Sequence, residues 1–224
     1  NPHKSANKKL LLKPADSLCF ECHDKADFKD KTTHSPVEAG ECISCHDPHK
    51  SANKKLLLKP TDTLCFDCHD KEDFKGKTTH SPVEAGECVS CHNPHKSANK
   101  KLLLKPTDTL CFECHDKADF KDKTTHAPVE AGECISCHSP HKSASKKLLL
   151  KPTDSLCFEC HDKADFKGKT THSPVEAGEC VSCHNPHKSA NNKLLLKPVD
   201  SLCFECHDRE DMKKVAKHSV DDKK

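Results

Sequence analysis

Cysteine pairs recur along this chain at a constant interval, and this regularity constrains the possible fold more than any other feature of the sequence. The chain contains 18 cysteines in 224 residues, and the first cysteine of each pair follows the previous one by 23 residues, from Cys19 to Cys203. Self-similarity at a short fixed period is typical of repeat proteins, in which each unit contacts mainly its neighbours. The spacing therefore predicts a tandem array rather than one globular core.

Two alternating half-repeats build a longer period of 46 residues. One half carries Leu-Cys-Phe-Glu/Asp-Cys-His-Asp, as at Cys19, and the other carries Cys-Ile/Val-Ser-Cys-His-x-Pro-His, as at Cys42. The segment that begins at His34 with HSPVEAGEC returns, with small changes, at His80, His126 and His172. We therefore predict a single elongated array divided into 1–33 (a partial repeat), 34–79, 80–125, 126–171, 172–217 and 218–224 (a degenerate tail).

The rest of the composition offers little material for an ordinary hydrophobic core. Only 33% of the residues are hydrophobic and 32% are charged, and the chain has no Trp or Tyr. A chain this polar would normally be disordered, so something must cross-link or ligate the cysteines. The formal charge of +2, with lysines alternating with acidic residues, argues against nucleic-acid binding. No apolar run approaches the roughly 20 residues of a membrane span.

All 18 cysteines belong to nine copies of the motif Cys-x-x-Cys-His. This motif is typical of c-type haem attachment, in which two thiols form thioethers with one porphyrin and the following His binds its iron. Zinc sites and disulfide frameworks also use paired cysteines, but neither requires a His after every pair. We predict nine c-type haems, attached at Cys19, Cys22, Cys42, Cys45, Cys65, Cys68, Cys88, Cys91, Cys111, Cys114, Cys134, Cys137, Cys157, Cys160, Cys180, Cys183, Cys203 and Cys206.

The 19 histidines fall into two groups. The motif histidines are predicted to bind iron on the proximal side: His23, His46, His69, His92, His115, His138, His161, His184 and His207. The other ten occupy only two positions of the repeat, and nine six-coordinate haems need nine such ligands. The predicted distal ligands are His3, His34, His49, His80, His95, His126, His141, His172 and His187, with His218 as a spare or inter-subunit candidate.

The pairing of distal histidines with haems is partly constrained by the spacing. His49 lies three residues after His46, and one short turn cannot reach both faces of a porphyrin, so His49 must serve another haem. In one arrangement each distal His serves the next motif downstream, so that His3 pairs with His23 and His34 with His46. In the other, His34 returns to the haem of His23, and His3 or His187 acts across a subunit boundary.

Short helices with irregular connections are the expected local structure. Ser35-Pro36-Val37-Glu38 has the pattern of a capping box with Pro36 at the first helical position, and Gly40 should end that helix after about one turn. Asp16 or Ser17 should cap a second helix that carries Cys19 and Cys22 on one face. Strand content should be negligible. The fold class is therefore mostly irregular with short α-helices, and stacked haems would form its core.

The segment 34–70, HSPVEAGECISCHDPHKSANKKLLLKPTDTLCFDCHD, joins a half-repeat of each kind and resembles the doubled CXXCH family of multihaem cytochromes. The resemblance extends over the whole chain as tandem copies. It implies bis-histidine haems of low potential, haem attachment outside the cytoplasm, and a role in respiratory or extracellular electron transfer. The chain also resembles cytochromes that polymerise into extracellular nanowires, although its repeats are more uniform.

Electron transfer along the haems is the predicted function, with the chain as the subunit of an extracellular or cell-surface filament built head to tail. Redox proteins or an extracellular acceptor would be its partners. A monomeric periplasmic electron shuttle is the first alternative. A multihaem reductase is the second, and it is disfavoured because catalysis needs an open iron position while ten candidate histidines face nine haems. We therefore expect no enzyme activity.

Overall fold

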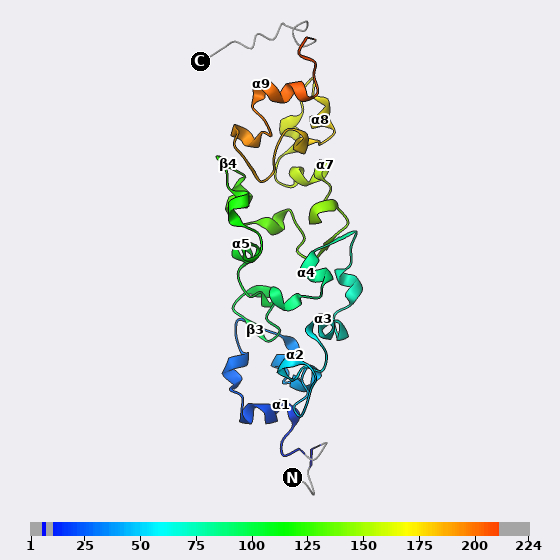
Figure 1. The fold of residues 1–224 in the computed structure, drawn as a ribbon, viewed down its shortest axis with the longest axis vertical. Coiled ribbons are helices and arrows are strands. Elements are labelled where there is room, and N and C mark those ends of the chain that lie inside the picture. The colour runs from blue at the N-terminus through cyan, green and yellow to red at the C-terminus, as the bar shows by residue number, and fades with distance from the viewer. Residues whose placement is uncertain (1–5, 8–10, 211–224) are drawn as a thin grey trace. The chain divides into compact units, whose positions relative to one another are not determined.

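The computed structural model describes residues 6–7 and 11–210. These residues divide into two compact units, the first made of residues 1–113 and 134–150 and the second of residues 114–133 and 151–224. Both units are built from four-residue α-helices joined by irregular connections (Figure 1). Two short 3-10 turns lie between successive α-helices along the described chain. The α-helices of the described residues are α1 (Ala15–Leu18), α2 (Ser35–Glu38), α3 (Thr61–Leu64), α4 (Ser81–Glu84), α5 (Thr107–Leu110), α6 (Ala127–Glu130), α7 (Thr153–Leu156), α8 (Ser173–Glu176) and α9 (Val199–Leu202).

Strands are few and only two residues long, as the sequence predicts. They are β1 (Thr32–Thr33), β2 (Thr78–Thr79), β3 (Lys96–Ser97), β4 (Thr124–Thr125), β5 (Lys142–Ser143) and β6 (Lys188–Ser189). Most of the remaining structure is 3-10 turns: η2 (Cys19–Glu21), η3 (Lys25–Phe28), η4 (Cys42–Ser44), η5 (Lys54–Leu56), η6 (Cys65–Asp67), η7 (Lys71–Phe74), η8 (Cys88–Ser90), η9 (Lys100–Leu102), η10 (Cys111–Glu113), η11 (Lys117–Phe120), η12 (Cys134–Ser136), η13 (Lys146–Leu148), η14 (Cys157–Glu159), η15 (Lys163–Phe166), η16 (Cys180–Ser182), η17 (Asn192–Leu194) and η18 (Cys203–Glu205).

The helix before the first cysteine pair starts at a proline. Pro14 is the N-cap of α1, and its carbonyl accepts the backbone N–H of Leu18 at 2.9 Å. The predicted cap by Asp16 or Ser17 is wrong, because the Ser17 hydroxyl instead donates back to the Pro14 carbonyl at 3.1 Å. Proline suits this position because its fixed φ favours the start of a helix. Its lack of an N–H costs no hydrogen bond, since an N–H at a helix start has no acceptor within the helix.

A helix of about one turn lies before the second cysteine pair, as predicted, and spans Ser35–Glu38. Its N-cap is His34 rather than Ser35, and no side chain caps it. Ser35 is therefore the first helical residue and Pro36 the second, so the predicted capping box is absent and the predicted position of Pro36 is one residue too early. Gly40 follows with a φ of +72°, and a Cβ there would lie 2.7 Å from the Asp16 carbonyl oxygen. Glycine is required for both reasons.

Long-range strand pairs connect repeats that lie far apart in sequence. β1 pairs with β3, β2 with β5 and β4 with β6, each antiparallel, so Thr33 lies opposite Lys96 in the first pair. The paired segments are separated by 64 residues, which is more than one full repeat. The fold is therefore not a string of independent 46-residue units, because each unit contributes a strand to a more distant one.

Hydrophobic burial does not hold these elements together. No hydrophobic side chain of the described residues is buried, and the buried polar residues are Ser97, Ser143 and Ser189. Protein interiors normally bury Leu, Ile, Val and Phe in close packing, so the polypeptide alone lacks a core. No helix in the described part of the chain is long and apolar enough to cross a membrane.

Candidate functional site

Each Cys-x-x-Cys-His motif forms a single tight turn. In the first motif the backbone N–H of Cys22 donates to the carbonyl of Cys19 at 3.2 Å, and the N–H of His23 donates to the same carbonyl at 3.0 Å. The same two bonds recur at Cys42, where Cys45 and His46 donate at 3.2 and 3.0 Å. The turn places both thiols on one side with the histidine directly after them. All 18 cysteines lie among the described residues, and none of them forms a disulfide bond.

Successive motifs approach one another through their thiols. Burial raises the pKa of the Cys65 thiol to about 11, with a further contribution from the neighbouring Cys88 thiol. Cys111 shows the same rise, to about 11, from burial and from Cys134. The second cysteines also meet, because Cys68 contributes to the raised pKa of Cys45 after burial. Adjacent motifs along the first unit therefore lie side by side.

Histidine rings of the two groups face each other in pairs. The ring centres of His34 and His69 lie 6.2 Å apart, with an angle of 10° between the ring planes. Rings in direct face-to-face contact would have planes only about 3.5–4 Å apart. Each pair joins one motif histidine to one of the other group, and the ring-centre distances are 6.0 Å for His46–His95, 6.0 Å for His92–His141, 6.3 Å for His126–His161 and 5.8 Å for His172–His207.

These separations match two imidazoles that share one metal ion. An imidazole nitrogen binds a metal at about 2 Å. The ring centre lies about 1 Å behind that nitrogen, so two rings on opposite sides of one ion have centres about 6 Å apart. No group of three or more His, Cys, Asp or Glu side chains in the described chain is gathered for direct metal binding. The recurrent arrangement is therefore a pair of facing histidines beside a pair of thiols.

Hydrogen bonds to carbonyls fix the tautomer of these histidines. His34 Nδ1 lies 2.9 Å from the Pro94 carbonyl oxygen, and His46 Nδ1 lies 2.9 Å from that of Lys55. A carbonyl can only accept, so Nδ1 carries the hydrogen and Nε2 keeps its free lone pair. The same contact recurs at His80, His92, His126, His138 and His184. A second hydrogen bond of this kind is typical of metal-binding histidines.

Three of the histidines that follow proline, His95, His141 and His187, are held in half-buried positions. Burial lowers the pKa of His95 and of His141, and the neighbouring rings of His46 and His92 add to the effect. A lowered pKa keeps the imidazole neutral, which is the form that binds metals. Phe28 supports His95 with an edge-on contact whose ring centres lie 5.6 Å apart.

The pairing of the two groups differs from both arrangements considered from the sequence. His34 faces His69, which lies 35 residues downstream, and not His46 or His23. His95 faces His46, which lies 49 residues upstream, so this set reaches back rather than forward. The two sets thus run in opposite directions along the chain. The physical cause is the β1–β3 strand pair, which carries His95 back to an earlier repeat. His3 and His218 lie outside the described residues.

Known protein families were compared with the chain. A family model described as a doubled CXXCH motif matches residues 1–28, 34–74, 80–120, 126–166 and 172–212. The chain belongs to this doubled CXXCH family. It is accordingly a multihaem c-type cytochrome, as its motifs predicted, with haem bound covalently through Cys-x-x-Cys-His. No curated protein matches the chain.

The side chains of the cytochrome fit the haem that its family implies. Each motif turn offers two thiols and a following histidine. A second imidazole lies at the ring-centre distance expected across one iron from the motif histidines His46, His69, His92, His161 and His207. Cys65 and Cys68 would hold one such haem, with His69 and His34 as its candidate axial ligands. The bound haem would supply an iron centre that accepts and returns one electron.

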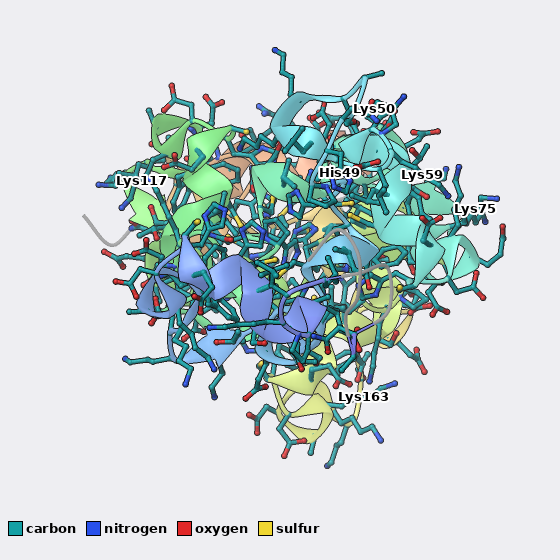
Figure 2. The ribbon with its side chains drawn as sticks, turned by 90° about the horizontal axis from the view of Figure 1, so that it is seen from below. His49, Lys50, Lys59, Lys75, Lys117 and Lys163 are labelled. Atoms are coloured by element: carbon teal, nitrogen blue, oxygen red, sulfur yellow. The ribbon has the colours of Figure 1, made fainter. Side chains whose placement is uncertain are left out.

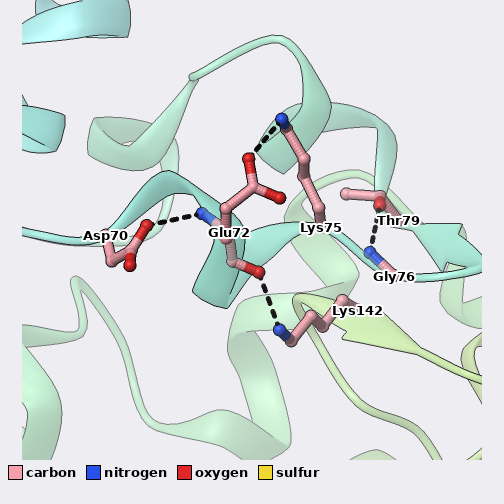
Figure 3. Close-up of polar contacts among 6 residues, drawn as sticks. All are labelled: Asp70, Glu72, Lys75, Gly76, Thr79 and Lys142. Carbon is pink, nitrogen blue, oxygen red and sulfur yellow. Dashed lines mark hydrogen bonds and ion pairs between the residues drawn. The ribbon is translucent and has the colours of Figure 1, made fainter.

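Sequence reasoning missed the residues that anchor the second group of histidines. Lys142 Nζ donates to the Glu72 carbonyl at 2.9 Å and ties β5 to η7, as Figure 3 shows. In the same loop Asp70 accepts the backbone N–H of Glu72, and Lys75 pairs with the Glu72 carboxylate (Figure 3). The only available signal was the unbroken recurrence of Pro-His-Lys-Ser in the repeat.

Proposed function

We propose that this cytochrome carries nine bis-histidine haems and passes electrons from each haem to the next. The observation that carries the proposal is the recurrence of facing histidine pairs with ring centres 5.8–6.3 Å apart, each beside a Cys-x-x-Cys turn. Two imidazole ligands leave the iron no open position, which suits electron transfer rather than substrate binding. The motif cysteines would carry the haems and the motif histidines would be the proximal ligands.

The contacts between successive motifs support a continuous electron path. Burial raises the pKa of the Cys42, Cys45 and Cys65 thiols, and a cysteine of a neighbouring motif adds to each rise. These neighbours are Cys19 for Cys42, Cys68 for Cys45 and Cys88 for Cys65. Each motif in this part of the first unit therefore lies against the next one along the chain. The thiols that would hold successive haems therefore lie close to one another in sequence order. Short steps between neighbouring cofactors are what an electron conduit requires.

Nine haems per chain is the first result to test. The holoprotein should exceed the mass of the haem-free chain by nine haems, and its oxidised form should be low-spin at every iron, because each has two imidazole ligands. Intact-mass spectrometry and electron paramagnetic resonance measure the two quantities. Fewer than nine haems, or a high-spin signal from the assembled protein, would contradict the count or the ligation.

The cellular setting completes the proposal. We place the chain outside the cytoplasm, at the cell surface or beyond it, as the subunit of a head-to-tail filament whose partners are redox proteins or an extracellular acceptor. A periplasmic shuttle is the alternative, and it needs the same haems without self-association. No enzyme activity is part of this proposal, because it leaves no iron position open for a substrate.

Imaging of the native protein separates the filament from the shuttle. We expect negative-stain electron microscopy of untreated material to show filaments, because open head-to-tail contacts do not close into a ring. The control is the same sample after dilution, which should shorten the filaments without releasing haem. Monodisperse single-chain particles under native conditions would rule out the filament and favour the shuttle.

A further inference from the structure

The chain docks one of its own segments onto another at three equivalent places. The docking segment has the sequence Pro-His-Lys-Ser, and the acceptor segment has the sequence Thr-Thr-His. In the first example, Pro94–Ser97 lies on Thr32–His34: the backbone N–H of His34 donates to the His95 carbonyl at 2.9 Å, and the His34 ring bonds the Pro94 carbonyl. Lys96 adds bonds of 3.3 and 3.4 Å to the Ala26 and Lys29 carbonyls.

Docking therefore completes two ligand pairs at once. It brings His95 to face His46, and it orients the His34 ring that faces His69. The same contacts recur where segment 140–143 meets segment 78–80 and where segment 186–189 meets segment 124–126. The docked serines are the most buried polar side chains of the described residues, at 7–9% exposure.

A fourth acceptor segment, Thr170–His172 in the second unit, carries no docking segment among the described residues. Thr170 and His172 are exposed, whereas the equivalent Thr124 and His126 are half-buried. Phe166 is 46% exposed, although the phenylalanines at the three docked positions are half-buried. A hollow of about 260 Å³ opens here and is lined by Phe158, Phe166, Thr171 and Val175 among others.

The ligand pair that this acceptor should complete is also unfinished. His184 is exposed and faces no other ring among the described residues, whereas His46, His92 and His138 are half-buried. Its Nδ1 still bonds the Lys193 carbonyl at 2.9 Å, so its Nε2 is prepared to bind a metal. The acceptor segment and His184 together form what we call the open site.

Two Pro-His-Lys-Ser segments remain as possible occupants, at 2–5 and at 48–51. The second is not docked in the described chain: the His49 side chain, labelled in Figure 2, is 90% exposed, and its Nδ1 lies 3.9 Å from an Asp47 carboxylate oxygen. The repeat register decides between these two segments. Each docking histidine lies 49 residues after the motif histidine that it faces, as His95 does after His46. The histidine that would face His184 therefore belongs at position 233 of a continued array.

A second copy that offered His49 in this register would collide with the first. Its residues 1–26 would fall on positions 185–210, which described residues of the first copy already occupy. A second copy that offers His3 is displaced by 230 positions, which is five repeats, and its first residue falls on position 231. Its segment 2–5 then falls on positions 232–235, beyond the described residues of the first copy.

We propose that Pro2–Ser5 of a second copy docks on Thr170–His172 and that His3 of this copy supplies the distal ligand of the haem at Cys180 and Cys183. The proposal rests on the haem binding proposed above. The docked segment would also give His172 the carbonyl partner that its ring lacks among the described residues, so one contact would finish the ligand pairs of His184 and His207.

The same displacement assigns the last candidate ligand. His34 faces a motif histidine that lies 35 residues downstream, at His69. The same spacing takes His218 to position 253. With the second copy displaced by 230 positions, position 253 is His23 of that copy. Each junction would thus exchange two ligands in opposite directions. Nine haems would then have nine distal ligands, and His49 would be the surplus histidine. Because the donor and acceptor are different surfaces, the contact repeats without closing.

Replacing His3 by alanine tests the junction, and His49→Ala is the matched control with the same sequence context. In the His3→Ala holoprotein, one haem per chain should become high-spin in electron paramagnetic resonance. Sedimentation velocity should show self-association weakened about tenfold or more, since a metal ligand and its support are lost. His49→Ala should match the unaltered protein in both measurements.

Three outcomes would overturn the proposal. One is low-spin iron at every haem of His3→Ala with unchanged association, and another is a high-spin haem in His49→Ala instead. The third is an unaltered protein that stays a single chain with all haems low-spin, since its ligands would then be its own. In each of these cases the proposed electron-transfer function would still stand if all nine haems were present and reducible. A chain that binds no haem would refute both the junction and the electron-transfer function.

Discussion

The haem-free chain is expected to be unfolded. In the described residues no hydrophobic side chain is buried, and the α-helices are only four residues long. Isolated helices shorter than about 12–15 residues are marginal in water, and ordering each residue costs about 1–2 kcal/mol of conformational entropy. The strand pairs have two residues per strand, which is too little to offset that cost. Haem binding must therefore supply most of the folding free energy.

Circular dichroism and amide NMR of the chain produced without haem attachment, with its thiols kept reduced, would measure this. We expect a spectrum of an unfolded chain, narrow amide dispersion and no cooperative thermal transition. The holoprotein under identical conditions is the control and should melt cooperatively. A haem-free chain with dispersed amide signals and a cooperative transition would show that the polypeptide folds without its cofactors and would contradict the expectation.

Local structure followed closely from the sequence because its signals are local. The short helix before the second cysteine pair, its end near Gly40 and the scarcity of strands were all predicted from residues within one or two turns of each other. The helix predicted through Cys19 and Cys22 instead ends at Leu18, and a 3-10 turn follows it. Other errors lie at helix starts. Asp16 and Ser35 have the side chains of N-caps, yet Pro14 and His34 occupy those positions. The fixed φ of Pro14 suits the start of the first helix. At the second helix the N-cap is a histidine whose ring bonds the Pro94 carbonyl, and neither helix has a side-chain cap.

The partners of the second group of histidines were beyond the reach of sequence reasoning. The half-repeat spacing is constant, so a histidine such as His34 stands in a regular register with several motifs at once. The choice is made by strands of two residues, Thr-Thr and Lys-Ser, whose pairing spans 64 positions. Such short strands carry no hydrophobic alternation that a sequence pattern could show. Only the three-dimensional arrangement distinguishes His69 from His46 and His23.

Exchange of His34 for alanine should disturb the haem at Cys65 and Cys68 and leave the haem at Cys42 and Cys45 intact. The ring of His34 lies 6.2 Å from that of His69, and its Nδ1–H is held by the Pro94 carbonyl, so Nε2 is directed for a ligand role. Removing one axial imidazole converts a low-spin ferric iron to a high-spin one. Electron paramagnetic resonance should therefore show one high-spin haem in His34→Ala.

Combining this variant with removal of single haems identifies which haem has changed. In His34→Ala with Cys65→Ala and Cys68→Ala, the high-spin signal should vanish, because its haem is no longer attached. In the matched control, His34→Ala with Cys42→Ala and Cys45→Ala, the signal should persist. The reverse pattern would restore the pairing of His34 with the next motif downstream. A signal that survives in both would place the ligand of His34 elsewhere, and the facing of its ring with His69 would then be packing rather than coordination.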